Sequence, residues 1–233
     1  MAPDLVLLDG GGGVRLLRLL QIVSPAMPIG AFAYSQGLEQ AVADGWVTDE
    51  SQAAAWLLGL LESSFATLDL PVLARLTSAW NAADLAGVGR WSAWLLASRP
   101  TQEARAEDRQ LGAALARALA AVGIEGAAGW VIRPDVTHAA MFALATARYT
   151  IPVAGALAGY AFSWAEAITS AAVRLVPLGQ NAGQRLLVAA GDAIERTVPL
   201  ALALADEDLG AATPGQALAS ARHETVYSRL FRS

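Results

Sequence analysis

The sequence predicts an all-α protein with a single domain. Apolar residues recur at helical spacing almost throughout the chain, and the alternating Val, Ile and Thr pattern of strands is scarce. With 233 residues, 55% of them hydrophobic and 16% charged, the chain can form one good-sized core. We expect a bundle of about ten helices. The high hydrophobic content further predicts a homodimer whose interface is drawn from the Ala- and Gly-rich residues 153–172.

Turn residues and capping signals divide the first half of the chain. Gly45 is expected to end one helix, Thr48 to cap the next, and Asp69 with Pro71 to begin another. Asp49 and Glu50 complement the dipole of the helix that Thr48 caps. The helices predicted here cover residues 14–23, 31–44, 49–65, 69–85 and 91–98, with a turn containing two prolines over 24–30.

The second half contains longer helical patterns. Thr101 is predicted to cap a helix rich in Arg and Glu, Asp135 to begin another, and Pro152 to lie in the first turn of an apolar one. Pro199 is expected to bend a long helix, and Pro214 to open the last. The predicted helices cover 102–122, a segment from 135, 152–175, 181–205 and 214–221, with loops at 123–129 and around 177–179.

Three parts of the chain are therefore expected. Residues 1–13, with four consecutive glycines and no basic start typical of a signal peptide, predict a flexible N-terminal tail. Residues 14–221 form the helical domain. Residues 222–233 mix Arg with Tyr and Phe, as the contact residues of protein interfaces do, and are predicted to be a partner-binding tail.

The composition excludes several functions. All 16 basic residues are Arg, so neither a phosphate-binding loop with its lysine nor Schiff-base catalysis is available. The chain has no Cys, which removes disulfides, thiolate ligands and thiol nucleophiles and permits a reducing cytoplasm. A net charge of −5 without a dense basic stripe argues against nucleic-acid binding.

Metal and hydrolase motifs are also missing. The two histidines, His138 and His223, do not form the Glu-x-x-His pairs of di-iron bundles, and neither lies in a motif with a nucleophile. His138, beside Met141 and Phe142, is interpreted as a core or interface residue. A dimer could bring two copies of a histidine together, which leaves His223 as a weak, transient metal candidate. No cofactor and no catalytic residue is predicted.

The longest uncharged run, between Arg148 and Glu166, contains Pro152 and three glycines. It is shorter and less apolar than the roughly 20 residues that a membrane-spanning helix needs. We therefore expect it to be buried in a protein interface, and we expect no membrane association.

Polar residues inside apolar segments form three candidate clusters. The first is Tyr34, Ser35, Gln36 and Glu39, for which local capping is the alternative explanation. The second extends from Tyr160 to Gln184, and buried hydrogen bonds would explain it without a function. The third is the segment 222–233, with a frayed basic tail as its alternative.

Six motifs in matching order resemble those of the urease accessory protein F (UreF) family. The N-terminal one reads LQIVSPAMPIGAFAYSQGLE over residues 20–39, and the C-terminal one reads RHETVYSRLFRS over 222–233. Between them lie LDLP (68–71), Arg99 with Thr101, Glu103 and Arg105, GYAFSW (159–164) and LVPLGQ (175–180). Ala33 departs from the family, where an aromatic residue or serine is common, and the Gly-rich N-terminal extension is a second departure.

The resemblance implies an all-α, cytoplasmic dimer that assists insertion of nickel into urease. It would bind the D- or H-type urease accessory protein, recruit the nickel-carrying GTPase accessory protein, influence its GTPase cycle, and reach apo-urease through the complex. The tail would be mobile in the free dimer and become ordered on the D- or H-type partner. The implied partner-binding residues are Tyr34, Ser35, Gln36, Glu39, Arg99, Glu103, Arg105, Arg222, His223, Glu224, Tyr227, Arg229, Phe231 and Arg232.

Two other classes of function compete with this interpretation. An enzyme that uses one of the polar clusters would show activity without any partner. A protein attached to a lipid surface is suggested only by the mean hydropathy of +0.42, and detergent-free solubility as a discrete dimer would argue against it.

Overall fold

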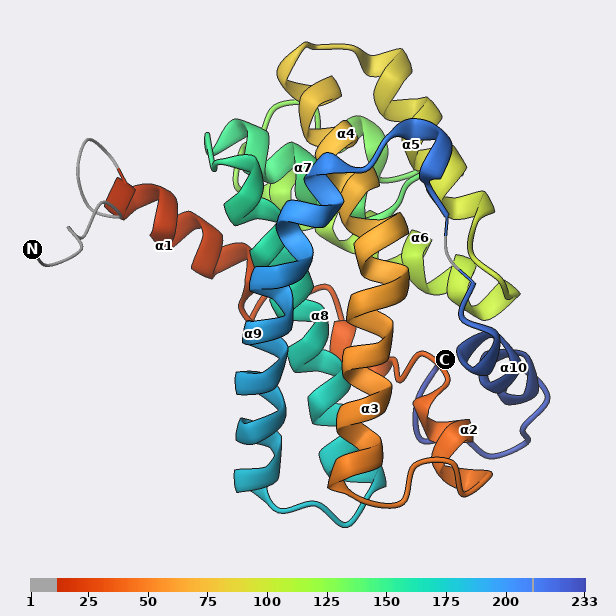
Figure 1. Cartoon of the computed structure of the whole chain (residues 1–233). Coiled ribbons are helices and arrows are strands. Elements are labelled where there is room, and N and C mark those ends of the chain that lie inside the picture. Colours follow the sequence, from red (N-terminus) through yellow and green to blue (C-terminus); the bar gives the residue numbers. More distant parts are fainter. Residues whose placement is uncertain (1–11, 211) are drawn as a thin grey trace, which may run out of the picture.

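The computed structural model describes residues 12–210 and 212–233, and all regular structure within those residues is helical (Figure 1). The predicted all-α fold is confirmed. The α-helices are α1 (Gly12–Val23), α2 (Leu38–Ala43), α3 (Glu50–Leu60), α4 (Leu70–Asn81), α5 (Leu85–Ala97), α6 (Gln102–Ala121), α7 (His138–Arg148), α8 (Val153–Leu175), α9 (Gln180–Ala203) and α10 (Pro214–His223). Shorter helices are η2 (Ala31–Ala33), the π-helix η3 (Leu61–Asp69), η4 (Ala128–Trp130) and η5 (Asp206–Asp208).

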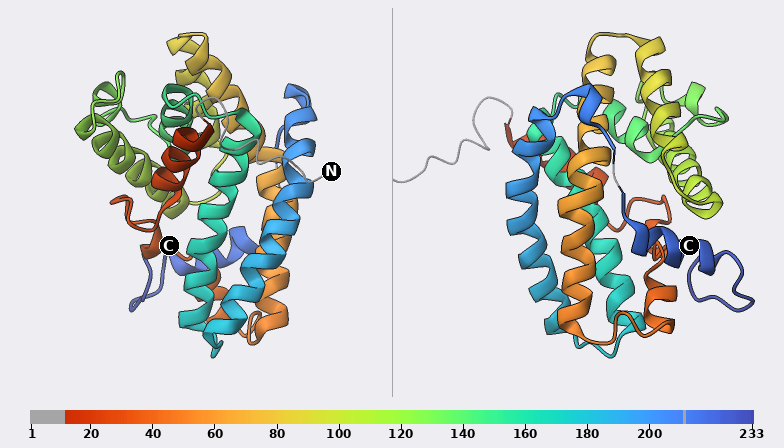
Figure 2. Two further views of the ribbon diagram at one scale, coloured as in Figure 1. Left: turned by 90° about the vertical axis from the view of Figure 1, so that its left-hand side faces the viewer. Right: turned by 45° about the vertical axis from the view of Figure 1, so that its right-hand side comes forward.

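The long helices α3, α8 and α9 lie side by side and form the body of the molecule (Figures 1 and 2). α8 and α9 are antiparallel, because a short loop joins them. At one end α4 packs on α5 and α7, and α7 packs on α6; at the side, α10 packs on α2. α1 contacts α8 and projects from the body. A Cβ on Gly159 of α8 would lie 2.7 Å from a methyl of Leu19, so this glycine permits the close approach of α1.

The predicted break between residues 65 and 69 is wrong, because α3, η3 and α4 form one continuous helix. Pro71 has no N–H to donate to the carbonyl of Thr67, four residues earlier, and the backbone is π-helical just before this point. The N–H of Gly210 donates to the Thr67 carbonyl instead, at 3.0 Å. A distant segment thus satisfies the group that proline leaves free, and the helix continues.

The single helix predicted over 31–44 is also wrong. η2 ends at Ala33, and α2 starts only at Leu38, because Gln36 and Gly37 have φ angles of 52° and 85°. A Cβ on Gly37 would lie 3.1 Å from the backbone nitrogen of Ser220, so glycine also permits the approach of α10. Gly45, with φ 76°, follows the end of α2 as predicted.

Several helix ends differ from the predictions by a few residues. Asp49, not Thr48, caps α3 by accepting from the Gln52 N–H, and Thr48 bonds the Gln52 side chain. Thr137, not Asp135, caps α7. α4 ends at Asn81 and α5 begins at Leu85, against predicted limits of 85 and 91, because Asp84 caps α5. The Thr101 cap and the helices starting beside Pro152 and Pro214 are confirmed. Pro199 lies inside α9.

Among the described residues one helix, Glu50–Asn81, is long and apolar enough to cross a membrane, but 61% of its apolar window is buried inside the protein. It includes Leu57, Leu61, Leu70 and Leu73, all at most 1% exposed. Its apolar character is therefore that of a core helix. Of the predicted N-terminal tail, residues 1–11 lie outside the described part of the chain, while Gly12 and Gly13 belong to α1.

Candidate partner-binding site

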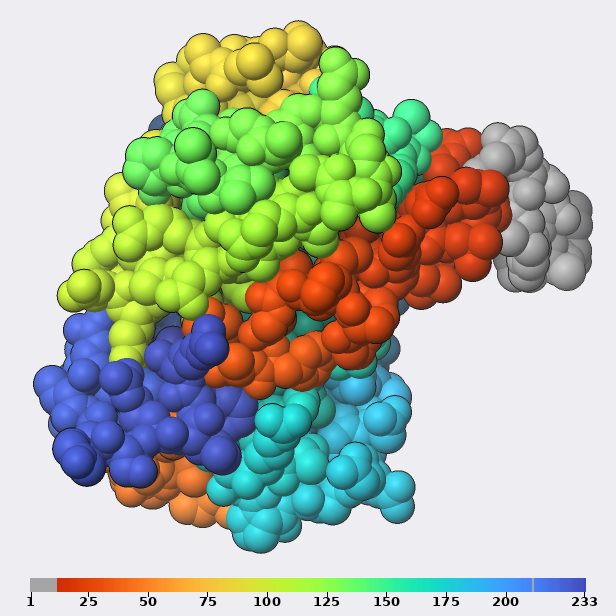
Figure 3. All heavy atoms as spheres, turned by 180° about the vertical axis from the view of Figure 1, so that it is seen from behind, coloured from red at the N-terminus to blue at the C-terminus, as the bar shows by residue number. Residues whose placement is uncertain are grey.

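Three carboxylates on two helices face the segment 222–233. Glu39 lies in the first turn of α2, and Glu103 and Glu107 lie one turn apart on α6. We call these three the docking carboxylates. Figure 3 shows the N-terminal segment, α6 and the C-terminal segment meeting on the back of the molecule. Residues far apart in the sequence thus form one site.

His223 lies between two of the docking carboxylates. Its side chain is 1% exposed, with Nδ1 at 2.8 Å from Glu103 and Nε2 at 3.2 Å from Glu39. Since both ring nitrogens have carboxylate partners, His223 joins α10 to α2 and α6. A metal ion could bind this ring only by displacing one of them. Among the described residues no group of three potential metal ligands occurs.

Backbone hydrogen bonds also hold the segment after α10 to the domain. Glu39 accepts from the N–H groups of Leu230 at 2.7 Å and Phe231 at 2.8 Å. The Arg232 N–H donates to the Ala33 carbonyl, and Ser35 donates its N–H to the Ser233 carbonyl, both at 2.8 Å. The Phe231 side chain is 4% exposed. The segment is therefore held by several contacts with the domain, whereas a mobile tail was expected.

The third docking carboxylate is deeply buried. Glu107 accepts from the Ser233 hydroxyl and from the Gln36 amide, each at 2.6 Å. Gln36 in turn accepts from the Trp164 indole of α8, also at 2.6 Å. A continuous chain of hydrogen bonds thus leads from the C-terminal segment through α6 to α8.

The two environments shift the carboxylate pKa values in opposite directions. Burial raises the pKa of Glu107 to about 7, because the two hydrogen bonds and the Arg99 charge only partly offset the loss of solvent. Burial also opposes ionisation of Glu39, but the N–H groups of Leu230 and Phe231 and the ring of His223 outweigh it and lower its pKa. With the segment 222–233 bound as it is in the structure, Glu39 is therefore ionised at neutral pH, whereas the Glu107 carboxyl has a pKa near neutrality.

Arg99 lies behind this network, with its side chain 17% exposed. It pairs with Asp69 at 2.6 Å and Asp108 at 2.8 Å, and Asp108 also accepts from the backbone N–H of His138. Burial would lower the pKa of Arg99, but the two carboxylates raise it well above the usual value. Arg105 donates to the Arg99 carbonyl at 2.7 Å. Arg99 thus connects η3 with α6, and Arg105 of α6 holds the backbone at Arg99.

The predicted site residues thus fall into three groups by exposure. Tyr34, Ser35, His223 and Phe231 are buried. Gln36, Glu39, Arg99, Glu103 and Arg105 are half-buried within the network. The exposed members are Arg222, Glu224, Tyr227, Arg229 and Arg232. The Tyr227 side chain is fully exposed, and Leu230, which lies in the predicted tail but was not named as a site residue, is 67% exposed.

Four further residues of the site were not predicted. Asp69, Glu107, Asp108 and Ser233 are buried polar residues that hold Arg99, Gln36 and Ser35. Asp69 was expected to begin a helix and belongs to the motif LDLP, but it was not named as a partner-binding residue. The pair Glu107 and Asp108 lies in a helix rich in alternating charges, where most such carboxylates are solvated, so no local signal marks it.

A family model describing UreF matches residues 47–191, more than half of the chain. The chain belongs to the UreF family. Urease accessory protein UreF of Alkalilimnicola ehrlichii is 48% identical over 95% of this chain and 97% of its own length. The UreF proteins of Teredinibacter turnerae and Hahella chejuensis are 47% and 43% identical, each over 94% of this chain and 99% of their own length. The family predicted from the six motifs is confirmed.

The family match covers only part of the docking site. The matched residues 47–191 contain Arg99, Glu103 and Glu107 but neither Glu39 nor the segment 222–233. The relatives are named urease accessory proteins. This name assigns no role to individual residues.

Proposed function

We propose that this chain is an assembly factor for nickel insertion into urease, which bridges the D- or H-type accessory protein and the nickel-carrying GTPase accessory protein. Apo-urease would be reached through that complex, and the GTPase cycle would be influenced within it. Membership of the UreF family supports this proposal, because the relatives are named urease accessory proteins. Nickel is the cargo of the complex, and the chain itself needs no cofactor.

The observation that carries the proposal is the way the segment 222–233 is held. Its backbone is bound by Glu39, and Phe231 is buried, so its conformation is stabilised by the domain. Between α10 and the buried Phe231, the Tyr227 side chain is fully exposed and the Leu230 side chain is 67% exposed. A pre-ordered loop that displays an aromatic and an aliphatic side chain loses little conformational entropy on binding. We infer that this loop binds the D- or H-type partner.

We further propose that the chain is not an enzyme, does not bind nucleic acid and acts in the cytoplasm. The absence of Lys and Cys from the sequence argues against catalysis by lysine or thiol chemistry, which agrees with a non-enzymatic role. The net charge of −5 argues against nucleic acid as a partner. We propose a cytoplasmic location and no membrane association, in keeping with the burial of the one long apolar helix.

We also propose a homodimer whose interface includes exposed apolar residues of α1 as well as of α8. On α1 the side chains of Val14, Leu17 and Leu20 are 61%, 65% and 52% exposed, and Phe162 of the adjoining α8 is 39% exposed. Together they are called the α1/α8 face below. This face includes one residue of the predicted interface segment 153–172. Large apolar side chains gathered on two packed helices are typical of a surface that another chain covers.

Co-purification tests the assembly role. Tagged wild-type protein should retain the D- or H-type accessory protein and, with it, the GTPase in the presence of nickel and GTP. A strain lacking the chain should produce urease that contains little nickel, and wild-type protein should restore it. Full nickel loading of urease in the deletion strain would refute the proposal, as would turnover of a substrate by the isolated chain without partners.

A further inference from the structure

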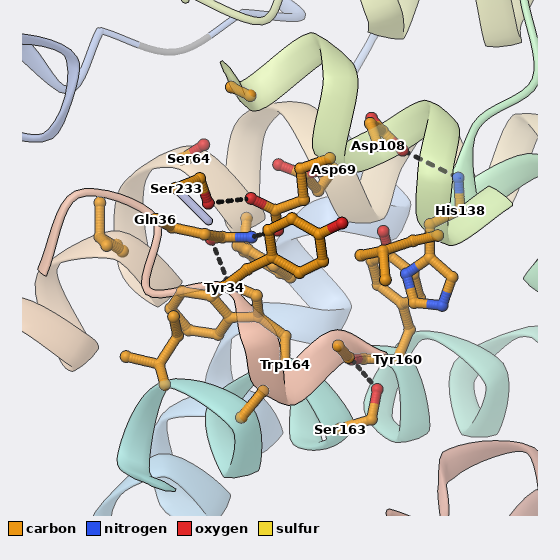
Figure 4. Close-up of a pocket in the computed structure, with 18 of the residues that line it drawn as sticks. Tyr34, Gln36, Ser64, Asp69, Asp108, His138, Tyr160, Ser163, Trp164 and Ser233 are labelled. Carbon is orange, nitrogen blue, oxygen red and sulfur yellow. Dashed lines mark hydrogen bonds between the residues drawn. The ribbon is translucent and has the colours of Figure 1, made fainter. Parts of the chain in front are cut away.

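A cavity of about 670 Å³ lies beside the docking site and reaches the inner face of α8 (Figure 4). This volume is within the range of roughly 300–1,000 Å³ that is typical of small-molecule sites. Helices α6, α7 and α8, η3 and the turn after α1 supply its walls. Much of the wall is apolar, with Met27, Leu68 and Ile168 among the contributors. The enclosed space is far larger than a single metal ion requires.

Aromatic rings form a continuous part of this wall. Phe65 packs at 4.3 Å from Trp164 and 6.1 Å from Tyr160, measured between ring centroids, and His138 lies 5.1 Å from Tyr160. Each of these residues lines the cavity. The face of an aromatic ring is electron-rich and attracts a cation that loses its water. Such a wall therefore favours an organic cation over a neutral or anionic ligand.

The same wall contains a buried carboxylate oxygen that has no hydrogen-bond partner among the described residues. This atom is Oδ2 of Asp69, a residue that is 2% exposed. Buried polar groups are normally hydrogen-bonded, so the free oxygen of Asp69 is available to accept a hydrogen bond from a molecule in the cavity.

The charge of the lining is negative. Asp69, Glu107 and Asp108 line the cavity, and Arg99 is the cationic side chain among its described lining residues. Burial lowers the pKa of His138 to about 4, so the imidazole is neutral at physiological pH and adds no positive charge. With Asp69 and Asp108 both paired to Arg99, one negative charge remains uncompensated before Glu107 is considered.

From the aromatic wall, the unpaired oxygen of Asp69 and the excess of carboxylates, we propose that the cavity binds a small organic ammonium ion with an apolar body. The ammonium group would lie near Asp69 and Tyr160, and the apolar body would lie against Phe65 and Trp164. The exposed Tyr227 and Leu230 do not line this cavity, and the proposal does not rest on the proposed assembly role.

A matched series of ligands tests the proposal on the wild-type protein. 2-Phenylethylammonium, 2-phenylethanol and 3-phenylpropionate have similar apolar bodies but different charges. Isothermal titration should give the ammonium ion at least about tenfold tighter binding than the alcohol, and no binding of the carboxylate. In a ¹⁵N-labelled sample, the Trp164 indole signal should shift with the ammonium ion, because this N–H lies in the wall. Equal affinity for alcohol and ammonium ion would overturn the proposal, as would binding of nickel chloride alone.

A pair of variants locates the site. Ser64→Leu places an apolar side chain in the cavity, since Ser64 lines it, and should abolish ammonium binding. Ser51→Leu, at an exposed position on the same continuous helix, is the matched control and should bind as the wild type does. Retention of the Trp164 shift by a folded Ser64→Leu variant would show that the ligand binds elsewhere. Circular dichroism establishes whether each variant is folded.

Discussion

The Glu39 carboxylate accepts a hydrogen bond from the backbone N–H of Phe231, 192 positions later in the chain, at 2.8 Å. Through this contact and the adjoining one to Leu230, Glu39 supports the segment after α10. Glu39 also contacts His223, so one side chain on α2 holds both the end of α10 and the loop that follows it.

Replacement of Glu39 should therefore release the segment. Glu39→Ala leaves two backbone N–H groups without their charged acceptor, a loss of about 1.5–3 kcal/mol per charged hydrogen bond before water replaces it. Amide hydrogen exchange over residues 224–233 should become much faster, while exchange in α8 should not change. Glu195→Ala, an exposed carboxylate on α9, is the control. Unchanged protection in Glu39→Ala would mean that other contacts suffice.

The pH dependence of stability should come from two buried groups with opposite signs. The pKa of Glu107 is raised from 4.5 to about 7, so the folded state binds the extra proton between these values and stability falls as pH rises through them. The pKa of His138 is lowered from 6.5 to about 4, so the unfolded state binds the extra proton and stability rises with pH between 4 and 6.5.

Glu107→Gln should separate the two contributions. In the wild type they oppose each other between about pH 4.5 and 6.5. In Glu107→Gln the His138 contribution remains, so urea midpoints should increase from pH 4.5 to 6.5 and then stay level between pH 6.5 and 7.5. The wild type should lose stability over that upper range. A decline of equal size in the variant would show that another group titrates there.

Two glycines inside helices should respond to alanine in opposite ways. A Cβ at Gly112 of α6 would lie 2.5 Å from the backbone carbonyl carbon of Thr137, so Gly112→Ala should separate α6 from α7 at the cost of about 1–3 kcal/mol. Gly191 of α9 has no atom within 4 Å of the added methyl, and alanine there should stabilise by up to about 1 kcal/mol. Chemical denaturation measures both changes.

The proposed dimer depends on the α1/α8 face. Leu17→Asp and Phe162→Asp place charges on exposed positions of the two helices, so the monomer fold should persist while self-association is lost. Sedimentation equilibrium at micromolar concentration should give a dimer for the wild type and a monomer for both variants. Leu200→Asp, on an equally exposed leucine of α9, should remain dimeric. A monomeric wild type would disprove the dimer.

Helix periodicity and capping residues were sufficient to predict the fold class and most helices. Thr101 identified its helix because a capping hydroxyl acts within three residues of the chain. The continuity of α3 with α4 could not be predicted, because the partner that replaces the missing bond at Pro71 is Gly210, far away in sequence. The same holds for Gly37, whose left-handed backbone is required by contact with α10.

The candidate site was predictable only in part, because contacts between distant segments also decide which residues belong to it. Motif resemblance indicated Glu39, Glu103, His223 and Arg229, and the structure brings these four side chains together. It did not indicate Glu107, and it included Asp69 only as part of the motif LDLP, without a role. The importance of both carboxylates arises from burial between distant elements. Nor did the resemblance indicate which members are internal, because Arg99 and Tyr227 look equally suited to an interface in the sequence but only Tyr227 is accessible.

The exposed loop gives the sharpest test of partner binding, because Tyr227 and Arg229 differ in what they contact. Tyr227 is fully exposed, so Tyr227→Ala should leave the free energy of unfolding unchanged within about 0.5 kcal/mol. If Tyr227 enters a pocket on the D- or H-type partner, the same change should weaken binding by on the order of 1–3 kcal/mol. Arg229 is ion-paired with Glu103, so Arg229→Ala should weaken both the docking of the loop and the partner complex.

Truncation distinguishes the loop from the rest of the domain. Deletion from residue 222 would remove His223, which is buried between Glu39 and Glu103, so the loop is better removed by ending the chain after Glu224. That truncated protein should keep its helical circular dichroism and its mass in sedimentation, yet lose co-purification with the D- or H-type partner. Ser228→Ala, at an exposed position in the same loop, is the control for local changes. If the truncated protein binds the partner undiminished, the loop is not the docking element, and the cluster around Tyr34 becomes the next surface to test.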